Sequence, residues 1–331
     1  MEFNYIEVCA GAGGMSMGLN LAGFKPLLLN DNNKDCCNTL KFNHKHKDIN
    51  IICDNMENLL NNKIIDKYIN KLDLLVGGIP CQSFSQAGKR KGLDDNRGKL
   101  IYSFIELIKK LNPKMFMIEN VKGLLTHNKG ETLNNILKLL NIDNTYNVIY
   151  KVLNAFDFGV PQKRERIFII GIHIDIKNIF EFPKKENKHK YLKDVLFDVP
   201  KSEYIKYNKE KIELFKMIPQ GGCWINLPEE LQKKYLGKSY TSGGGKRGIL
   251  KRLSFDEPCL TLLCSPTQKQ TERCHPTENR PLTIREYARI QTFPDDYVFC
   301  GSITSQYKQI GNAVPIELVK KIAINLINCL T

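Results

Sequence analysis

No stretch of the sequence approaches the ~20 apolar residues that a membrane-spanning helix needs, so we expect no membrane span. The N-terminal residues MEFNYIEVCAGAGG lack the basic segment, apolar core and cleavage site of a signal peptide. The 11 cysteines are scattered, with Cys36 and Cys37 adjacent and no C-x-x-C pair, a spacing that argues against the disulfide scaffold of short secreted chains. It also argues against a zinc site, which could be drawn from Cys259, Cys264, Cys274 and His275. We expect reduced thiols, no metal and an intracellular protein.

The composition is that of a basic globular chain. It has 331 residues, of which 42% are hydrophobic, and a net charge of +14. The length predicts two domains, or one large domain with an insertion. The charge is compatible with a polyanionic partner. Compositional drift explains it equally well, because Lys, Asn and Ile are abundant throughout the chain.

Short apolar segments alternate with helical patterns in the first half of the chain. Strands are predicted at 5–8, 25–31, 72–78, 114–120 and 166–172. Helices are predicted after the glycine turn at 11–14 and at 100–111, 280–297 and 315–328. This alternation is typical of an α/β fold with a parallel sheet covered on both faces. From 200 to 280 the periodicity weakens and Gly, Pro and polar residues increase, which predicts a second, smaller domain.

A cofactor site is predicted at the ends of the first strands. The turn glycines would let a ligand approach the backbone, although Ser16 breaks the G-x-G-x-x-G pattern of dinucleotide sites. Asp31 ends the second strand, 20 residues after Gly11, where a carboxylate can bind both ribose hydroxyls. Asp54 could reach an adenine amino group. We expect a nucleoside cofactor without a pyrophosphate; the alternative is that the glycines serve only a tight turn.

A candidate catalytic group follows two later strands. Cys81 comes after Pro80 at the C-terminal end of a strand, where parallel sheets place their chemistry, although such cysteines are more often inert. Glu119 ends the next strand. Arg164 and Arg166 are two residues apart in an extended segment, so they point the same way. They could pair with the acid and with a substrate oxygen.

Six motifs occur in a family's order: AGAGG, PCQ, ENV, QKRER, RPLTIREYARIQTFPD and QIGNAVP. In these motifs the chain resembles the DNA cytosine-5 methyltransferases, from residue 5 to about 318. The resemblance implies a Rossmann-like sheet of the S-adenosylmethionine-dependent methyltransferases with a smaller target-recognition domain. We expect the catalytic domain at 1–199 and 302–331 and the target-recognition domain at 200–301.

The resemblance also implies roles for the catalytic groups. Cys81 would add to cytosine C6, Glu119 would meet N3, Arg166 would hold O2 and Arg164 would support it. S-adenosylmethionine would supply the methyl group, and a loop at 82–98 would close on a flipped-out base. The expected cofactor-binding residues are Cys9, Gly11, Gly13, Gly14, Asp31, Asn32, Asp54, Asn55, Pro80, Leu100 and Asn312. Three of them depart from the family pattern: Cys9 replaces an aromatic residue, Asn32 a bulky one and Asn55 an apolar one.

Double-stranded DNA is the partner that the resemblance implies. Side chains suited to phosphates and base edges are Gln82, Ser85, Lys89, Arg90, Lys246, Arg247, Arg252, Gln268, Gln270 and Arg273. For the residues between 200 and 280, the alternative is an ordinary solvated loop. We expect a cytoplasmic, nucleoid-associated monomer, with a cognate restriction endonuclease encoded alongside it.

Three rival functions are weighed against this one. A tRNA methyltransferase of the same fold usually carries Cys-Phe-Thr, which this chain lacks. An inactive DNA-binding module would not need Cys81, Glu119 and Arg166. An NAD oxidoreductase is disfavoured by Ser16.

Overall fold

A computed structural model describes residues 2–44, 49–79, 99–241 and 248–331. Within these ranges the main sheet has seven strands in the order β3-β2-β1-β4-β5-β8-β6. The strands are β1 (Asn4–Val8), β2 (Lys25–Asp31), β3 (Asn50–Cys53), β4 (Leu74–Gly77), β5 (Met115–Val121), β6 (Tyr146–Asn154) and β8 (Glu165–His173). The order reverses between β1 and β4, which places a ligand-binding crevice at their carboxyl ends.

The sheet is not parallel throughout, so this part of the sequence prediction is wrong. The five strands from β3 to β5 are parallel to their neighbours, but β8 runs antiparallel to both β5 and β6. Only residues 155–164 join β6 to β8. Antiparallel neighbours need only a short connection, whereas parallel neighbours need a crossover of a dozen or more residues.

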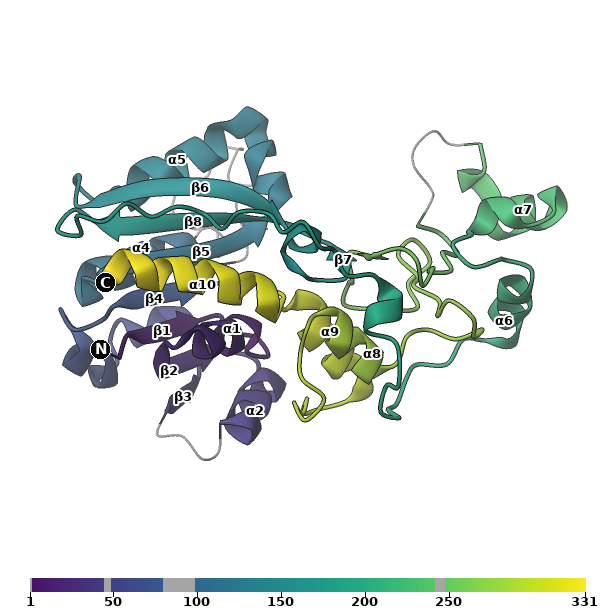
Figure 1. The fold of residues 1–331 in the computed structure, drawn as a ribbon, viewed down its shortest axis with the longest axis horizontal. Helices are drawn as coiled ribbons and strands as arrows, with labels where there is room; N and C mark the ends of the chain where they lie inside the picture. The colour runs from purple at the N-terminus through teal and green to yellow at the C-terminus, as the bar shows by residue number, and fades with distance from the viewer. Residues whose placement is uncertain (1, 45–48, 80–98, 242–247) are drawn as a thin grey trace.

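Helices cover both faces of the sheet, as Figure 1 shows. On one face α1 (Gly14–Ala22) packs beside α10 (Ile316–Leu330). The other face is covered by α3 (Met56–Leu59), α4 (Lys99–Leu111) and α5 (Glu131–Leu140). The buried residues of α4 include Ile101, Phe104, Ile105 and Ile108, spaced as one face of a helix requires. Beside β2 and β3 lies α2 (Lys34–Asn43), whose first turn is capped by the Asn33 side chain.

Gly14 is required by the close packing of α1 on the segment before α10. A Cβ atom at this position would lie 2.5 Å from the Val314 carbonyl oxygen. Any larger residue would push the start of α1 away from the QIGNAVP motif, so this glycine brings the two motifs together.

The region after β8 has little regular structure. Its elements include α6 (Lys209–Lys216), α7 (Glu229–Leu236) and the two-residue strand β9 (Cys259–Leu260). This strand pairs in parallel with β7 (Gln162–Lys163), a two-residue strand in the connection between β6 and β8. Short 3-10 helices lie at Lys63–Tyr68, Lys122–Leu125, His127–Gly130, Ala155–Phe158, Leu192–Asp194, Trp224–Asn226 and Gly237–Ser239. One hydrophobic cluster is confined to 207–274, and we call this part the second region.

The segment that follows the second region packs with residues near the main sheet. Leu282 and residues of α8 (Ile284–Ile290) and α9 (Ile303–Asn312) share a hydrophobic cluster with Ala12, Leu192 and Ile316. This cluster is separate from the one at 207–274. Among the described residues, no helix has the length and apolar character to cross a membrane.

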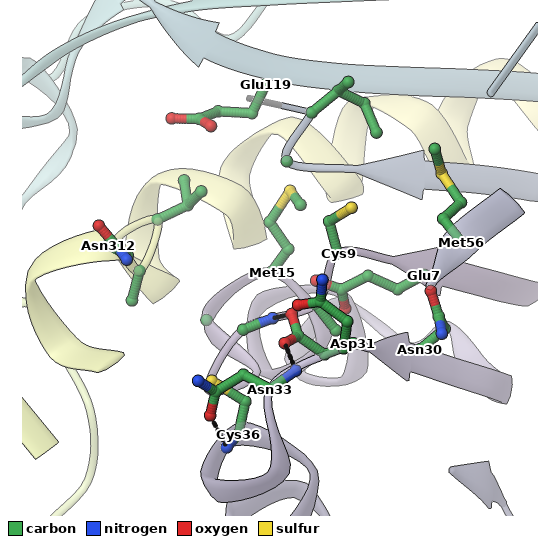
Figure 2. Close-up of a pocket in the computed structure, with 18 of the residues that line it drawn as sticks. Glu7, Cys9, Met15, Asn30, Asp31, Asn33, Cys36, Met56, Glu119 and Asn312 are labelled. Carbon is green, nitrogen blue, oxygen red and sulfur yellow. Dashed lines mark hydrogen bonds between the residues drawn. The ribbon is translucent and has the colours of Figure 1, made fainter. Parts of the chain in front are cut away.

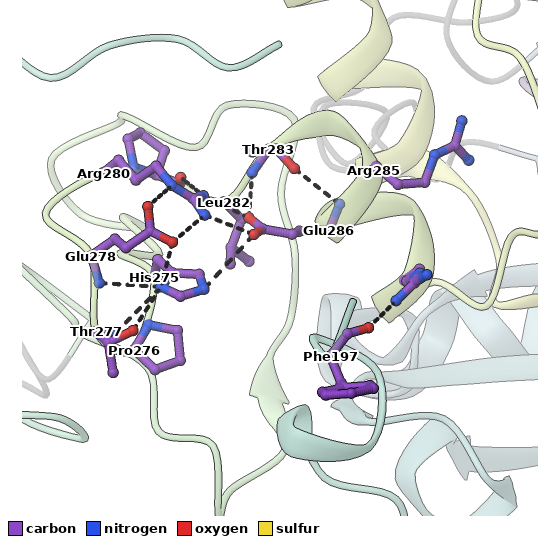
Figure 3. A network of polar contacts seen from close by, with 12 residues as sticks. Phe197, His275, Pro276, Thr277, Glu278, Arg280, Leu282, Thr283, Arg285 and Glu286 are labelled. Carbon is purple, nitrogen blue, oxygen red and sulfur yellow. Dashed lines mark hydrogen bonds and ion pairs between the residues drawn. The ribbon is translucent and has the colours of Figure 1, made fainter. Parts of the chain in front are cut away.

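Ion pairs join the segment 275–280, which follows the second region, to α8, as Figure 3 shows. Arg280 donates to both oxygens of Glu286, at 2.8 and 2.9 Å, and to Glu278 at 2.8 Å. Glu286 also accepts from the Thr283 backbone and closes the capping box of α8. His275 lies buried beside both acids, and burial lowers its pKa.

Candidate active site

A cavity of about 700 Å³ lies at the carboxyl ends of the central strands. It is lined by the ends of β1, β2, β4 and β5, by the turn before α1 and by α9. Its volume is within the range of sites for drug-sized ligands. Figure 2 shows Asp31 at one end of the cavity and Glu119 at the other. The fold therefore brings the predicted cofactor residues and the predicted catalytic acid to one cavity.

Asp31 is fixed by two backbone donors. Its Oδ2 accepts from Gly11 N and its Oδ1 from Asn33 N, each at 2.8 Å. Each carboxylate oxygen can accept more than one hydrogen bond, so both remain available to a pair of ligand hydroxyls. The 20-residue spacing from Gly11 thus corresponds to a direct contact that orients the acid.

Glu7 is a charged group at the site that the sequence interpretation missed. It is fully buried in β1, and neither carboxylate oxygen makes a hydrogen bond of normal geometry within the described residues. Burial and the nearby Asp31 raise its pKa well above the usual value, and only the Ser16 backbone amide opposes them. In the sequence, the signal for Glu7 is an ionisable residue within an apolar strand, because an acid is costly to bury without a partner.

Cys9 lines the cavity but is not a nucleophile. Its backbone has φ 52°, a left-handed conformation that is uncommon for residues other than glycine. Burial, followed by the charge of Asp31, raises the pKa of its thiol to about 12. The thiol is therefore protonated at neutral pH and offers only packing and a weak donor.

The other predicted cofactor residues divide into two groups. Gly11, Gly14, Asn32, Asn55, Leu100 and Asn312 line the cavity together with Cys9 and Asp31. At the rim, Asn32 Nδ2 donates to Asn55 Oδ1 at 3.0 Å. Gly13 and Asp54 do not line the cavity, although their neighbours Gly14 and Asn55 do, and their predicted roles stay predictions. Gly13 is the N-cap of α1, and Asp54 Oδ1 accepts from Asn55 N and Asn58 Nδ2.

The predicted catalytic acid is paired with one of the two arginines. Arg166 Nε lies 3.0 Å from Glu119 Oε1, and both side chains are largely buried. Burial raises the pKa of Glu119, and the charges of Arg166 and Arg164 only partly oppose this. The raised pKa favours a protonated acid that can donate to a substrate. Next to it, Asn120 Nδ2 donates to the Ile79 carbonyl at 2.6 Å and ties β5 to the end of β4.

Arg164 lies buried behind the site, and its predicted role as a supporting partner of Arg166 stays a prediction. Its side chain is 2% exposed and donates to the carbonyl oxygens of Leu262 at 3.1 Å and Gly311 at 3.0 Å. Three segments therefore meet at this guanidinium. Buried carbonyl oxygens need such donors, so Arg164 is a structural tie. Asn312, on the same segment as Gly311, accepts a hydrogen bond from the Cys264 thiol at 3.0 Å.

Several predicted residues lie outside the described residues. They are Pro80, Cys81, Gln82, Ser85, Lys89, Arg90, Lys246 and Arg247. Their predicted roles stay predictions.

Two predicted DNA-binding arginines are buried, which corrects their assignment. Arg252 is 4% exposed and donates to the carbonyl oxygens of Phe215, Ile218, His275 and Glu278. Arg273 is 6% exposed and donates to Glu272 O and Thr261 O. Neither guanidinium is free to meet a phosphate or a base. Gln268 and Gln270 are exposed, as contact with DNA requires. No group of three or more potential metal ligands occurs among the described residues.

Comparisons with known proteins agree with this geometry. The profile of the family described as C-5 cytosine-specific DNA methylase matches residues 3–328. The type II methyltransferase M.Sau96I of Staphylococcus aureus is 48% identical over 338 residues, covering 99% of this chain and 76% of the relative. M.Eco47II of Escherichia coli is 47% identical over 326 residues, covering 96% of this chain and 76% of the relative.

Solved structures share the fold. A candidate DNA modification methyltransferase encoded within an E. coli prophage has a TM-score of 0.72 and 26% identity, covering 99% of both chains. The S. pombe Dnmt2 methyltransferase has a TM-score of 0.66 and 17% identity over the full length of both, a likeness of fold alone. The chain belongs to the C-5 cytosine-specific DNA methylase family and is a DNA (cytosine-5) methyltransferase.

Proposed function

We propose that this protein methylates cytosine at C5 within a specific sequence of double-stranded DNA, with S-adenosylmethionine as the methyl donor bound in the 700 Å³ cavity. The observation that carries the proposal is the Glu119–Arg166 pair, which shares this cavity with Asp31. An acid with a raised pKa can donate to a pyrimidine N3, and an arginine can donate to its O2. A carboxylate held by a glycine turn suits a ribose. One cavity thus has a nucleobase end and a nucleoside-cofactor end.

The residues present fit this cofactor. Asp31 would accept from the ribose hydroxyls, and the backbone near Gly11 and Gly14 allows close approach. Glu7 gives an independent indication, because an unpaired buried acid at the cavity is stabilised by a positively charged ligand. S-adenosylmethionine carries an ammonium and a sulfonium charge, and when bound it supplies an electrophilic methyl group. A dinucleotide would instead bring the negative charge of its pyrophosphate towards Glu7.

The protein's own groups would carry the ring chemistry. The Cys81 thiolate forms a bond to C6, and the electron pair of the C5–C6 double bond moves so that C5 becomes nucleophilic. Glu119 donates its proton at N3, which neutralises the charge that develops on the ring. Arg166 holds O2 and fixes the ring in plane with the acid. After C5 has taken the methyl group, the C5 proton is lost to solvent, Cys81 departs as a thiolate and the N3 proton returns to Glu119, which restores the aromatic ring and the free enzyme groups.

The remaining proposals concern partners and organisation. The net charge of +14 supports a polyanionic substrate. The separate hydrophobic cluster at 207–274 supports a target-recognition domain that is distinct from the catalytic part. Similarity to type II methyltransferases supports a cognate restriction endonuclease as a genetic partner. We further propose that the enzyme acts as a monomer in the cytoplasm, on nucleoid DNA.

Methyl transfer from labelled S-adenosylmethionine tests the function. The protein is incubated with duplex DNA, with tRNA and with neither, and 5-methylcytosine is measured by mass spectrometry of the digested nucleic acid. We expect 5-methylcytosine in the DNA sample alone, and its loss in Glu119→Gln, which removes the acid but keeps its shape. Methylation of tRNA instead of DNA would contradict the proposal. Bisulfite sequencing of the methylated DNA then gives the recognised sequence.

A further inference from the structure

We propose that the turn at 267–272 reads DNA bases, with Gln268 and Gln270 contacting base edges and the buried Glu272 positioning them. The inference rests on the proposed function, because base reading requires DNA as the substrate. It assigns a positioning residue that contacts neither the cofactor nor the target cytosine.

Glu272 holds both sides of the turn. Its side chain is fully buried, and Oε1 accepts from Tyr235 Oη at 3.0 Å and lies 3.2 Å from Lys211 Nζ. The same Lys211 ammonium donates to the Thr267 carbonyl at 3.3 Å, at the other end of the turn. A buried carboxylate is strongly destabilising unless it is paired, so this arrangement allows the turn few alternative conformations.

Two further contacts close the turn. Thr271 N donates to the Gln268 carbonyl at 2.9 Å. On the other side, a Cβ atom at Gly248 would lie 2.9 Å from the Gln270 carbonyl oxygen, so only a glycine permits this close packing. The backbone of the turn is therefore supported along its length.

The turn exposes the side chains of residues 268–270, and one of them, Lys269, contacts a neighbouring residue. Lys269 Nζ donates to the Tyr235 carbonyl and lies 4.6 Å from the centre of the Tyr235 ring. Gln268 and Gln270 are exposed, and no hydrogen bond of either amide side chain occurs within the described residues. A rigid turn thus presents two neutral amides with no local partner.

The turn lies close to the proposed active site. Cys264, four residues before Gln268, is exposed and donates to Asn312 Oδ1 at the cavity. Four residues span at most ~14 Å of extended chain. At ~3.4 Å per base pair this distance corresponds to about four base pairs. Gln268 is therefore within reach of bases next to a cytosine that occupies the cavity.

The chemistry favours bases over phosphates. A glutamine amide carries both a donor and an acceptor, and it can bind a base edge through two hydrogen bonds. Phosphate binding relies mainly on Lys and Arg, whose charge releases counterions, and a neutral amide contributes nothing to that effect. Substitution of Gln268 or Gln270 should therefore change sequence preference without changing the salt dependence of DNA binding.

Methylation profiling on random-sequence duplex DNA tests the proposal with Gln268→Ala, Gln270→Ala and Glu272→Gln. We expect discrimination to relax roughly tenfold to a hundredfold at particular base pairs for each glutamine variant. The salt slope of DNA binding and the cofactor affinity should match wild type. Glu272→Gln should relax the same positions together. The matched control is Glu213→Gln, an exposed acid of α6 that pairs with Lys216 and should keep the wild-type profile.

If Glu272→Gln does not fold, Tyr235→Phe removes one hydrogen bond to Oε1 and gives a milder relaxation of the same positions. Wild-type profiles in both glutamine variants would overturn the assignment of base contacts. A profile of Tyr235→Phe or Glu272→Gln equal to that of Glu213→Gln would overturn the positioning role. If wild type itself does not methylate DNA, the proposed function fails, which is a different result from unchanged profiles.

Discussion

The sheet and the second region use buried charge in different ways. At the sheet, neither carboxylate oxygen of Glu7 makes a hydrogen bond of normal geometry within the described residues, although the side chain lines a cavity. In the second region, Arg252 donates to five carbonyl oxygens, and Glu272 joins Tyr235 to Lys211. Hydrogen-bonded strands already hold the sheet together, so its buried charge is available to a ligand. In its described residues the second region has the short helices α6 and α7, two 3-10 helices and the two-residue strand β9, and buried charge holds its loops.

In the catalytic part, we expect the largest loss of methyl transfer when the nucleophile is replaced. Cys81→Ser should lose at least ~10³ in methyl transfer, because a serine hydroxyl is a much weaker nucleophile than a thiolate. DNA binding should persist. Wild type should also form a denaturant-resistant adduct with DNA that carries 5-fluorocytosine, since fluorine cannot leave as a proton does. A fully active serine variant, or the absence of that adduct, contradicts the mechanism.

Arg252 provides the corresponding test in the second region. Arg252→Ala leaves several buried carbonyl oxygens without a donor and should destabilise the protein by about 3 kcal/mol. Denaturant unfolding measures this loss. A phosphate-binding arginine would behave differently: stability would be unchanged, and the salt slope of DNA binding would fall by ~0.9. That second outcome would restore the assignment that the burial of Arg252 argues against.

Asp31 tests the cofactor end of the cavity. Asp31→Ala should weaken S-adenosylmethionine binding by ~1–3 kcal/mol, the value of lost charge-assisted hydrogen bonds. Calorimetry measures the affinity. The control is Glu106→Ala, an exposed acid of α4 that pairs with Lys109. Equal affinities in the two variants would place Asp31 outside the binding site.

Glu7 gives a smaller effect that depends on pH. Its folded-state pKa is raised, so between its unfolded-state pKa and the raised value the folded protein binds more protons than the unfolded chain. This contribution to stability is present at low pH and is lost as pH rises. Glu7→Gln should therefore melt a few degrees above wild type at pH 8 without cofactor, with a smaller difference at pH 5. A difference in melting temperature that does not change with pH would contradict the raised pKa.

Much of the sheet could be predicted from the sequence because its strands are local apolar patterns. The segments 25–31 and 114–120 correspond closely to β2 and β5. The direction of β8 could not be predicted, because strand pairing depends on the length and path of the connections. The spacing from Gly11 marks Asp31 in the sequence, whereas Glu7 is a single acid within the short strand segment YIEV and has no comparable spacing to a glycine turn.

The second region shows why composition alone does not assign a DNA contact. Arg252 and Arg273 have the residue type that binds phosphates, but their neighbours in space are carbonyl oxygens from distant segments. Nothing local in the sequence distinguishes a buried arginine from an exposed one in an irregular chain. Gln268 and Gln270 are exposed, whereas Glu272 in the same turn is buried and accepts a hydrogen bond from Tyr235.

The division of labour between the two regions is tested most directly by measuring cofactor affinity and methylation profile together in Asp31→Ala and Gln270→Ala. We predict that Asp31→Ala weakens cofactor binding and keeps the wild-type sequence profile, whereas Gln270→Ala keeps the affinity and changes the profile. If either variant changes both properties, or if Gln270→Ala changes neither, the two regions do not have the separate roles proposed here.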